Sequence, residues 1–497
     1  MWETLGTAIA AVFNFSALLW ISIGTVLGIV VGALPGLTAT MGIAIMLPLC
    51  ITLGPELGMA TLLGVYMGAV TGASIPAILL GIPGNPNAIA TVADGQGMAR
   101  NGEPGRALGL AVTASFIGGM FSLLVLVLVS PFLAKVALSF GPPEYFGLAL
   151  MGLTLIATVS GKNMIKGLIA GILGLMVSTV GFDPLTGSGR FIFNNPNLMS
   201  GISLVPVLIG MYAIGQVLVS ASDESQMGQV RAFKKEKIFP SLKELWEYRR
   251  TILEAALIGT GIGVLPGTGA SIAVFLAYER ARKISRHPES FGQGAPDGIL
   301  APETANNAVT GGAMVPTLTL GIPGDGSTAL LLGALTIFGL RPGPLLFRDQ
   351  SAFMYTIFLA IFMANIFMVI YQIGGIRLFV NILKVPPAIL MPIVLVLSVV
   401  GAYAININAF DIGVAVVFGI VSFIFKKTDV PLVPMILGVV LGGMFEAELR
   451  RGLVLYQGNF FGFFSRPIFA ALFLVTVLSL MWPWLSAYIK KRKGAAA

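Results

Sequence analysis

Residues 263–271 read Gly-Val-Leu-Pro-Gly-Thr-Gly-Ala-Ser, and residues 32–40 repeat the pattern as Gly-Ala-Leu-Pro-Gly-Leu-Thr-Ala-Thr. Both copies stand inside strongly apolar segments. Proline lacks the N–H that a helix interior needs and clashes with the preceding turn, and the adjacent glycine adds backbone freedom. Each Leu-Pro-Gly therefore predicts a broken helix or a hairpin tip. A proline kink in a continuous helix is the alternative for either copy alone, and the repetition favours the break.

The composition is that of a polytopic membrane protein. Of the 497 residues, 56% are hydrophobic and only 10% are charged, whereas a soluble domain carries about 25% charged residues. Charge-free runs, the first between Glu3 and Glu56, are long enough to cross a bilayer. The net charge of +8 comes from short loops and the C-terminus, as the positive-inside rule expects, and does not indicate nucleic-acid binding. The single cysteine, Cys50, excludes an internal disulfide.

Other landmarks also occur twice, in the same order. Residues 81–87 (Gly-Ile-Pro-Gly-Asn-Pro-Asn) match residues 321–327 (Gly-Ile-Pro-Gly-Asp-Gly-Ser), and a Pro-Pro pair occurs at 142–143 and at 386–387. Landmarks in register indicate an internal duplication. We therefore predict an all-α polytopic integral membrane protein with two homologous repeats, whose broken helices or re-entrant hairpins meet at mid-membrane. The precedent of transporters whose interrupted helices meet at mid-membrane favours an inverted relation between the repeats. A parallel relation is the alternative.

These landmarks divide the chain into four parts. Residues 1–220 are the first predicted membrane repeat, residues 251–465 are the second, and residues 466–497 are a C-terminal transmembrane helix with a basic tail. Residues 221–250 form a polar linker whose excess of lysine and arginine places it on the cytoplasmic side. Trp246 and the leucines near it predict an amphipathic interfacial helix in this linker.

Small polar residues gather at the four predicted tips, where helices restart. A helix N-terminus offers free N–H groups and the positive end of the helix dipole, so each restart suits an anion. Carbonyl, hydroxyl and carboxylate oxygens at the broken ends suit Na⁺. The predicted substrate-binding residues are Pro35, Gly36, Thr38, Thr40, Gly84, Asn85, Pro266, Gly267, Thr268, Gly269, Ser271 and Gly324. The predicted Na⁺ ligands are Asp325, Asn306, Asn307, Thr268 and Thr38.

Simpler interpretations exist for the polar residues of the second half. Asp325 is the one carboxylate at the four tips, and it also suits a cap on the following helix. Asn306 and Asn307 follow Glu303 at the entry to an apolar segment. These three residues form either a helix N-terminus with a first-turn carboxylate or a binding site.

The sequence offers little for other chemistry. The tips contain no lysine or arginine, so helix ends and hydroxyls must hold an anion there, unless the polar loop at 94–106 folds inward and supplies Arg100 and Arg106. The one histidine, His287, lies in a basic loop, and no zinc-protease, nucleophile-elbow or nucleotide-binding motif is present. These features disfavour an enzyme and a transporter driven by ATP on this chain.

The paired Leu-Pro-Gly and Gly-Ile-Pro-Gly elements, together with Ala-Pro-Glu-Thr-Ala-Asn-Asn-Ala at 301–308, resemble the large membrane subunit of the tripartite tricarboxylate transporters, the TctA family. Thr304 fills the variable position of that segment. The resemblance covers nearly the whole chain and implies a multi-pass secondary transporter of the bacterial inner (plasma) membrane. It implies symport of di- or tricarboxylates such as citrate with Na⁺ or H⁺, and no cofactor.

The same resemblance implies two protein partners, a small membrane subunit (TctB-like) and a periplasmic solute-binding protein (TctC-like). Membrane lipid surrounds such a subunit, and a homo-oligomer is left open. An ion or small-anion channel is the alternative function, although two unlike pairs of tips suit alternating access better than a pore. An intramembrane enzyme is a further, weaker alternative.

Overall fold

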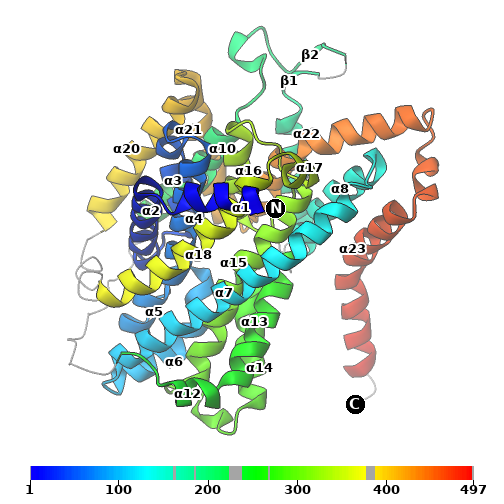
Figure 1. Ribbon diagram of the computed structural model, residues 1–497. Helices are drawn as coiled ribbons and strands as arrows, with labels where there is room; N and C mark the ends of the chain where they lie inside the picture. The colour runs from blue at the N-terminus through cyan, green and yellow to red at the C-terminus, as the bar shows by residue number, and fades with distance from the viewer. Residues whose placement is uncertain are drawn as a thin grey trace.

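The computed structural model describes residues 2–159, 164–183, 186–222, 238–266, 269–375 and 387–494. They form helices and one two-stranded antiparallel sheet, in which Gly181 pairs with Arg190 (Figure 1). The elements before the polar linker are α1 (Trp2–Val12), α2 (Phe15–Ala33), α3 (Ala39–Thr52), α4 (Pro55–Gly72), α5 (Ser74–Leu79), η1 (Pro86–Ala88), α6 (Ile89–Arg100), α7 (Pro104–Ala137), α8 (Pro142–Val159), α9 (Met164–Ser178), β1 (Gly181–Phe182), β2 (Gly189–Arg190), η3 (Pro196–Leu198), α10 (Leu204–Ile209), the π-helical η4 (Gly210–Ile214) and α11 (Gly215–Ser222). The later elements are α12 (Leu242–Glu247), α13 (Arg249–Val264), α14 (Gly269–Ile284), η5 (Pro288–Ser290), α15 (Asp297–Leu320), α16 (Gly326–Ile337), α17 (Pro344–Asp349), α18 (Ser351–Gly374), α20 (Pro387–Asn406), α21 (Ala409–Lys427), α22 (Leu432–Leu455), η6 (Phe460–Ser465) and α23 (Pro467–Gly494).

Eight helical segments in the described part of the chain are long and apolar enough to cross a bilayer. They are Phe15–Ala33, Pro55–Leu79, Pro104–Ala137, Leu204–Ala221, Ser351–Gly374, Ile389–Asn406, Ala409–Lys427 and Leu432–Leu455. The chain is therefore a helical, multi-pass membrane protein, and this part of the predicted fold class is confirmed.

Each Leu-Pro-Gly segment ends a helix, and the two helix ends have the same geometry. Leu34 follows α2 and Leu265 follows α13, both in an extended conformation with ψ of 114° and 115°. The N–H of each leucine donates to the carbonyl oxygen of the residue three positions earlier. Beyond the first tip, the Thr38 hydroxyl accepts the N–H of Met41 and caps α3. Both segments are thus helix breaks, as predicted, and not kinks.

The two Gly-Ile-Pro-Gly segments also share one backbone geometry. Gly81 and Gly321 stand just past α5 and α15 in the left-handed region, each with φ of +71°, which L side chains rarely adopt. Asn85 and Asp325 then cap the next helices, η1 and α16, from extended backbone. Equal geometry at such distant positions supports the internal repeat.

In each half, glycines let two helices approach closely, and the two helix pairs are equivalent. In α2, a Cβ on Gly28 would lie 2.4 Å from the carbonyl oxygen of Val65 in α4. In α13, a Cβ on Gly259 would lie 2.4 Å from the carbonyl oxygen of Ala305 in α15. Small residues are the usual means by which membrane helices bring their backbones together. Here they hold the helix that ends at each Leu-Pro-Gly against the helix that leads to each Gly-Ile-Pro-Gly.

Gly259→Ala is expected to destabilise the protein by about 1–3 kcal/mol, because the added methyl group overpacks against the backbone of α15. Gly261 lies in the same helix, but no heavy atom lies within 4 Å of a Cβ added there. Gly261→Ala is therefore the matched control and should be neutral or slightly stabilising, since alanine favours a helix over glycine. Thermal unfolding of the detergent-solubilised protein measures both variants. Equal melting temperatures would contradict the close approach of α13 and α15.

Equivalent helices of the two halves lie toward opposite ends of the molecule. In Figure 1, α6 and α14 lie near α12 at one end, whereas their equivalents, α16 and α3, lie toward the end that carries β1 and β2. Helix α12 belongs to the described part of the linker, and its Leu242 and Trp246 side chains are 86% and 68% exposed. Exposed apolar side chains on a short helix that also carries lysine and glutamate suit the predicted position at the membrane interface.

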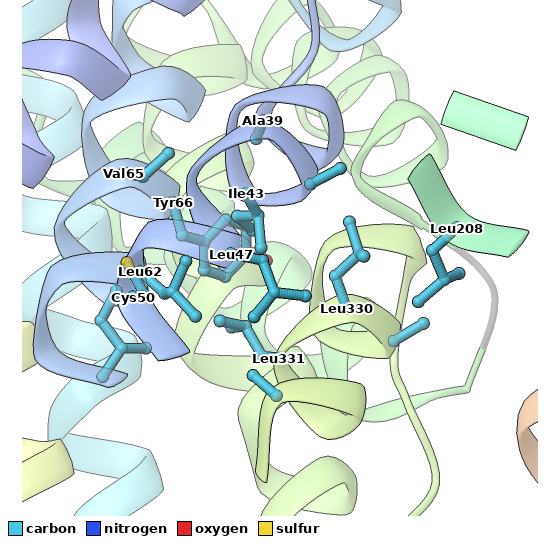
Figure 2. Close-up of a cluster of buried hydrophobic side chains, with 14 of the residues drawn as sticks. Ala39, Ile43, Leu47, Cys50, Leu62, Val65, Tyr66, Leu208, Leu330 and Leu331 are labelled. Atoms are coloured by element: carbon cyan, nitrogen blue, oxygen red, sulfur yellow. The ribbon is translucent and has the colours of Figure 1, made fainter. Parts of the chain in front are cut away.

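A buried apolar cluster joins the helices that begin at tips of different halves. Ile43 and Leu47 of α3 lie in one cluster with Leu330 and Leu331 of α16, and Leu208 of α10 packs beside them (Figure 2). Between helices in lipid, close packing rather than escape from water supplies the attraction. This packing fixes the two helices and thereby positions the polar residues at their N-terminal ends.

Candidate functional site

The four tips surround one cavity of about 330 Å³. Its walls come from the N-terminal ends of α3, α14 and α16, from η1, and from the middle of α4 and α15; η4, α11, α21 and α22 complete it. The predicted site residues that line it are Thr38, Thr40, Asn85, Gly269, Ser271, Asn306 and Asp325. Residues from both halves of the chain line the cavity.

Hydrogen bonds connect each Leu-Pro-Gly tip to the Gly-Ile-Pro-Gly tip of the other half. The hydroxyls of Thr40 and Ser327 are 3.0 Å apart. The Ser271 hydroxyl donates to Oδ1 of Asn87 at 2.7 Å. Thr40 and Ser271 occupy equivalent positions in the repeat, and so do Asn87 and Ser327. The two contacts therefore join equivalent positions of the repeated sequence.

Other cavity residues form equivalent pairs whose chemistry differs between the halves. Asn85 and Asp325 are the equivalent caps of η1 and α16. Tyr66 of α4 and Asn306 of α15 stand at equivalent distances before their Gly-Ile-Pro-Gly segments. The carboxylate at the tips thus belongs to the second half, where the first half has a neutral amide.

Asp325 is a helix cap and a cavity residue at once. Its Oδ1 accepts the N–H and the hydroxyl of Thr328 at 2.7 and 2.8 Å, which is a capping box at the start of α16. Its Oδ2 accepts the Tyr66 hydroxyl at 3.1 Å. A carboxylate has about four lone-pair directions, so this arrangement leaves room for a cation as well.

Helix α15 begins at Asp297, so Glu303 lies well inside the helix. The interpretation of Glu303 and the following asparagines as a helix N-terminus is therefore wrong. The reason is that the segment before Glu303 is also helical and its side chains are buried, although it contains an acid and a glycine. The Glu303 carboxylate is buried and accepts the hydroxyls of Thr91 and Ser115 at 2.6 and 3.3 Å. It connects α15 to α6 and α7.

The two asparagines of α15 have different surroundings. Asn307 accepts the Thr71 hydroxyl at 2.8 Å and donates to the carbonyl oxygen of Glu303, so its amide is used in packing. Asn306 lines the cavity and donates to the carbonyl oxygen of Val70 at 3.4 Å. Its Oδ1 is buried and has no hydrogen-bond partner among the described residues. Buried polar atoms are rarely left unpaired, and an amide oxygen at this place suits a cation.

The remaining predicted site residues shape the tips or fall outside the described residues. Those that do not line the cavity are Pro35, Gly36, Gly84, Pro266, Asn307 and Gly324. The N–H of Gly36 donates to the carbonyl oxygen of Gly84 at 3.1 Å, which joins the two tips of the first half. Gly267 and Thr268 lie outside the residues that the structure describes.

Arg100 and Arg106 do not reach the cavity, and the prediction of a polar loop over residues 94–106 is wrong. Helix α6 runs to Arg100, whose side chain is exposed, and α7 begins at Pro104. Arg106 forms ion pairs with Glu103 and Glu244 at 3.0 and 2.7 Å. The buried Asp94 and the exposed Arg100, together with the glycines of α6, gave the appearance of a loop. The ion pairs of Arg106 hold it at the linker.

Several polar cavity residues were not predicted from the sequence. Among them are Tyr66, Tyr212, Gln216 and Lys426. The internal repeat contained a signal for Tyr66, because it occupies the position equivalent to Asn306. The others lie on η4, α11 and α21, which reach the cavity only through tertiary packing. The Tyr212 hydroxyl is buried, with no partner in the described part of the chain.

The fold and the cavity define the class: a multi-pass helical membrane protein with two related halves that meet at a polar cavity built on interrupted helices. The family comparison agrees, since the model of the Tripartite tricarboxylate transporter TctA family matches residues 18–437. The chain belongs to this family. The family is one of transporters, and membership implies a tripartite system with TctB and TctC partners.

Two relatives come from Agrobacterium vitis. An uncharacterized 52.8 kDa protein in the TAR-I ttuC' 3' region is 35% identical over 475 residues, which cover 96% of this chain and 94% of that protein. An uncharacterized protein in the TAR-II ttuC' 3' region is 36% identical over 228 residues, which cover 45% of this chain and 94% of that protein.

Proposed function

We propose that this protein is the membrane subunit of a secondary active transporter that takes up di- or tricarboxylates such as citrate. Uptake is coupled to Na⁺ or H⁺ and crosses the bacterial inner membrane. A periplasmic solute-binding protein delivers the substrate, and a small membrane subunit completes the system. The observation that carries this proposal is the polar cavity at which interrupted helices of both halves meet, because transporters place their substrate and ion sites at such breaks.

The cavity suits an anion and a cation together. Helices α3, α14 and α16 direct their N-terminal ends at it, and the hydroxyls of Thr38, Thr40 and Ser271 add donors. Thr268 is proposed to belong to this set on sequence grounds. The described residues contain no group of three or more His, Cys, Asp and Glu side chains that could hold a metal ion. A Na⁺ ion would instead use Asp325, the free amide oxygen of Asn306 and carbonyl or hydroxyl oxygens.

We also propose that the repeats are inverted. The positions of α6 and α16 toward opposite ends of the molecule support this relation (Figure 1). The basic linker favours a cytoplasmic position for the α12 end. Residues 1–220 and 251–465 would move relative to each other and expose the cavity to one side of the membrane at a time. Residues 221–250 would be the cytoplasmic linker, and residues 466–497 a C-terminal transmembrane helix with a basic tail.

Sidedness of labelling tests the inverted relation. Asn101 follows α6 and Arg341 follows α16, and both side chains are exposed. Single cysteines at these positions are expected to react with a membrane-impermeant maleimide from opposite sides of the membrane, Asn101→Cys from the cytoplasmic side. The native Cys50 is buried, so the background is low. Reaction of both cysteines from the same side would mean that the repeats are parallel.

Uptake by proteoliposomes tests the function itself. The complete system, with binding protein and small subunit, is expected to accumulate radiolabelled citrate or succinate against its gradient when an inward Na⁺ or H⁺ gradient is applied. A channel would only equilibrate the solute. Failure to move any carboxylate under either gradient would refute the proposed function.

A further inference from the structure

Among the described residues that line the cavity, one carries an ammonium group: Lys426, in the last turn of α21. Its side chain is exposed at the cavity, where an incoming solute can reach it. None of the ion pairs formed by the described residues includes Lys426. Lysines are common at the ends of membrane helices. A lysine that also lines a cavity and has no acidic partner is a candidate for binding an anionic solute.

A neutral amide holds this ammonium beside the first Leu-Pro-Gly tip. Lys426 Nζ donates to Oε1 of Gln216 in α11. The Nε2 atom of Gln216 donates to the Ser220 hydroxyl at 3.4 Å, and it would lie 3.5 Å from a Cβ placed on Gly36. The carbonyl of one amide accepts from a single donor and does not neutralise the charge. Among the described residues, two donors of the ammonium therefore stay available for an anion.

The carboxylate of the cavity makes no ion pair with this ammonium. Asp325 is bonded through both of its oxygens to Thr328 and Tyr66. It also repels a carboxylate near it, which directs an anionic substrate toward Lys426. The cavity thus has an acidic position at the second Gly-Ile-Pro-Gly tip and a basic position beside the first Leu-Pro-Gly tip.

We propose that Lys426 binds one carboxylate of the substrate, and that Gln216 holds the ammonium in place when the cavity is empty. The proposal rests on the proposed function and specifies how the substrate is recognised. One carboxylate forms a charge-assisted contact with Lys426. Any further carboxylate of the substrate is bound by helix N-terminal N–H groups, by hydroxyls and by a bound cation. The required substrate feature is therefore a single free carboxylate within reach of Lys426.

The test compares Lys426 with its neighbour Lys427. The ammonium of Lys427 lies 5.7 Å from the centre of the Phe423 ring, and Lys427 does not line the cavity. Binding of citrate and of succinate to the purified, full-length protein is measured by calorimetry and by ligand-induced thermal stabilisation. Lys426→Met is expected to weaken binding about 10- to 100-fold, whereas Lys427→Met changes it less than about twofold. Lys426→Arg should retain most of the affinity.

A cysteine variant separates loss of charge from loss of fold. Lys426→Cys should bind weakly, and modification with aminoethyl methanethiosulfonate, which adds an ammonium group, should restore binding. The native Cys50 is buried and does not interfere. Citrate should also slow the modification.

The outcomes distinguish this inference from the proposed function. If the native protein binds these carboxylates and both Lys426→Met and unmodified Lys426→Cys bind them equally well, Lys426 has no role in recognition and the proposed function stands. If the native protein binds and transports neither carboxylate, the proposed function fails, and this inference fails with it.

Discussion

Asp325→Asn is expected to leave the protein folded. It should either abolish the dependence of uptake on the coupling cation or raise the cation concentration needed for half-maximal uptake about 10- to 100-fold. Asparagine is as good a helix cap as aspartate, and the first half already has asparagine, Asn85, at the equivalent position. The substitution therefore keeps the cap on α16 and removes only the charge. A contact between a charged group and its ligand is worth about 1.5–3 kcal/mol, which corresponds to the stated loss in affinity.

Asp325→Ala removes the cap as well as the charge, so it should also lower the melting temperature, by an amount that corresponds to about 0.5–2 kcal/mol. Asp349→Asn is the control, because that carboxylate is exposed and paired with Arg348. Uptake is measured in proteoliposomes over a range of Na⁺ concentrations and pH values. If Asp325→Asn transports with unchanged ion dependence, Asp325 serves only as the cap that the structure shows.

The helix breaks were predictable because their causes are local. Proline removes a donor wherever it stands, and the glycine beside it permits a turn. Leu34 and Leu265 consequently end their helices in the same conformation. The N-terminal positions of Thr38, Asn85 and Asp325 follow from the same breaks, since each is a preferred cap residue just beyond one. Local rules thus sufficed to choose residues around the cavity.

The wrong predictions concern polar residues that are buried in the fold. Glu303 looks like a helix N-terminal residue because acids are rarely buried. Here the hydroxyls of Thr91 and Ser115, far away in the sequence, satisfy its carboxylate and allow it to stand inside α15. Residues 94–106 look like a loop for the same reason. In both segments the buried carboxylate is satisfied by hydrogen-bond donors about 200 residues away in the sequence. No local sequence pattern shows such partners.

Lys426 shows a third limit. It ends a charge-free run, where positive residues are common at the membrane boundary, and its neighbour Lys427 has the same local sequence context. The packing of α21 against η4 and α11 brings only the first of the two lysines to the cavity. A single sequence carries no signal that separates them.

The contacts that join the two halves also differ in what they do. The hydrogen bonds at the tips connect neutral hydroxyls and amides, whose net contribution is about 0.5–1.5 kcal/mol each. Such bonds can break and re-form during a transport cycle. A second connection between the halves, made by a buried carboxylate of α6, is charged and has more partners, and it has a structural role.

Asp94→Ala is accordingly expected to destabilise the protein more than either Gly259→Ala or Asp325→Ala. The Asp94 side chain is fully buried in α6, and its Oδ1 accepts the N–H groups of Gly292, Gly294 and Ala295 at 2.8, 3.0 and 2.8 Å. Its Oδ2 accepts the Tyr278 hydroxyl at 2.8 Å. All four donors belong to the second half and lie on α14 or on the segment that leads into α15.

Removing this carboxylate strands three backbone donors, of which the one at Ala295 is buried. Each bond to a charged acceptor is worth about 1.5–3 kcal/mol, and the bonds are not fully additive, so a loss of about 4 kcal/mol or more is expected. That is a large part of the roughly 5–15 kcal/mol typical of a folded protein.

Asp94→Asn keeps one oxygen to accept the N–H groups, so its melting temperature should fall between those of the native protein and Asp94→Ala. Glu289→Ala, at an exposed residue just before the same segment, is the control and should change little. The measurements are the monodisperse yield in detergent and the melting temperature. If Asp94→Ala and Glu289→Ala have the same melting temperature, the connection between α6 and the second half does not stabilise the fold.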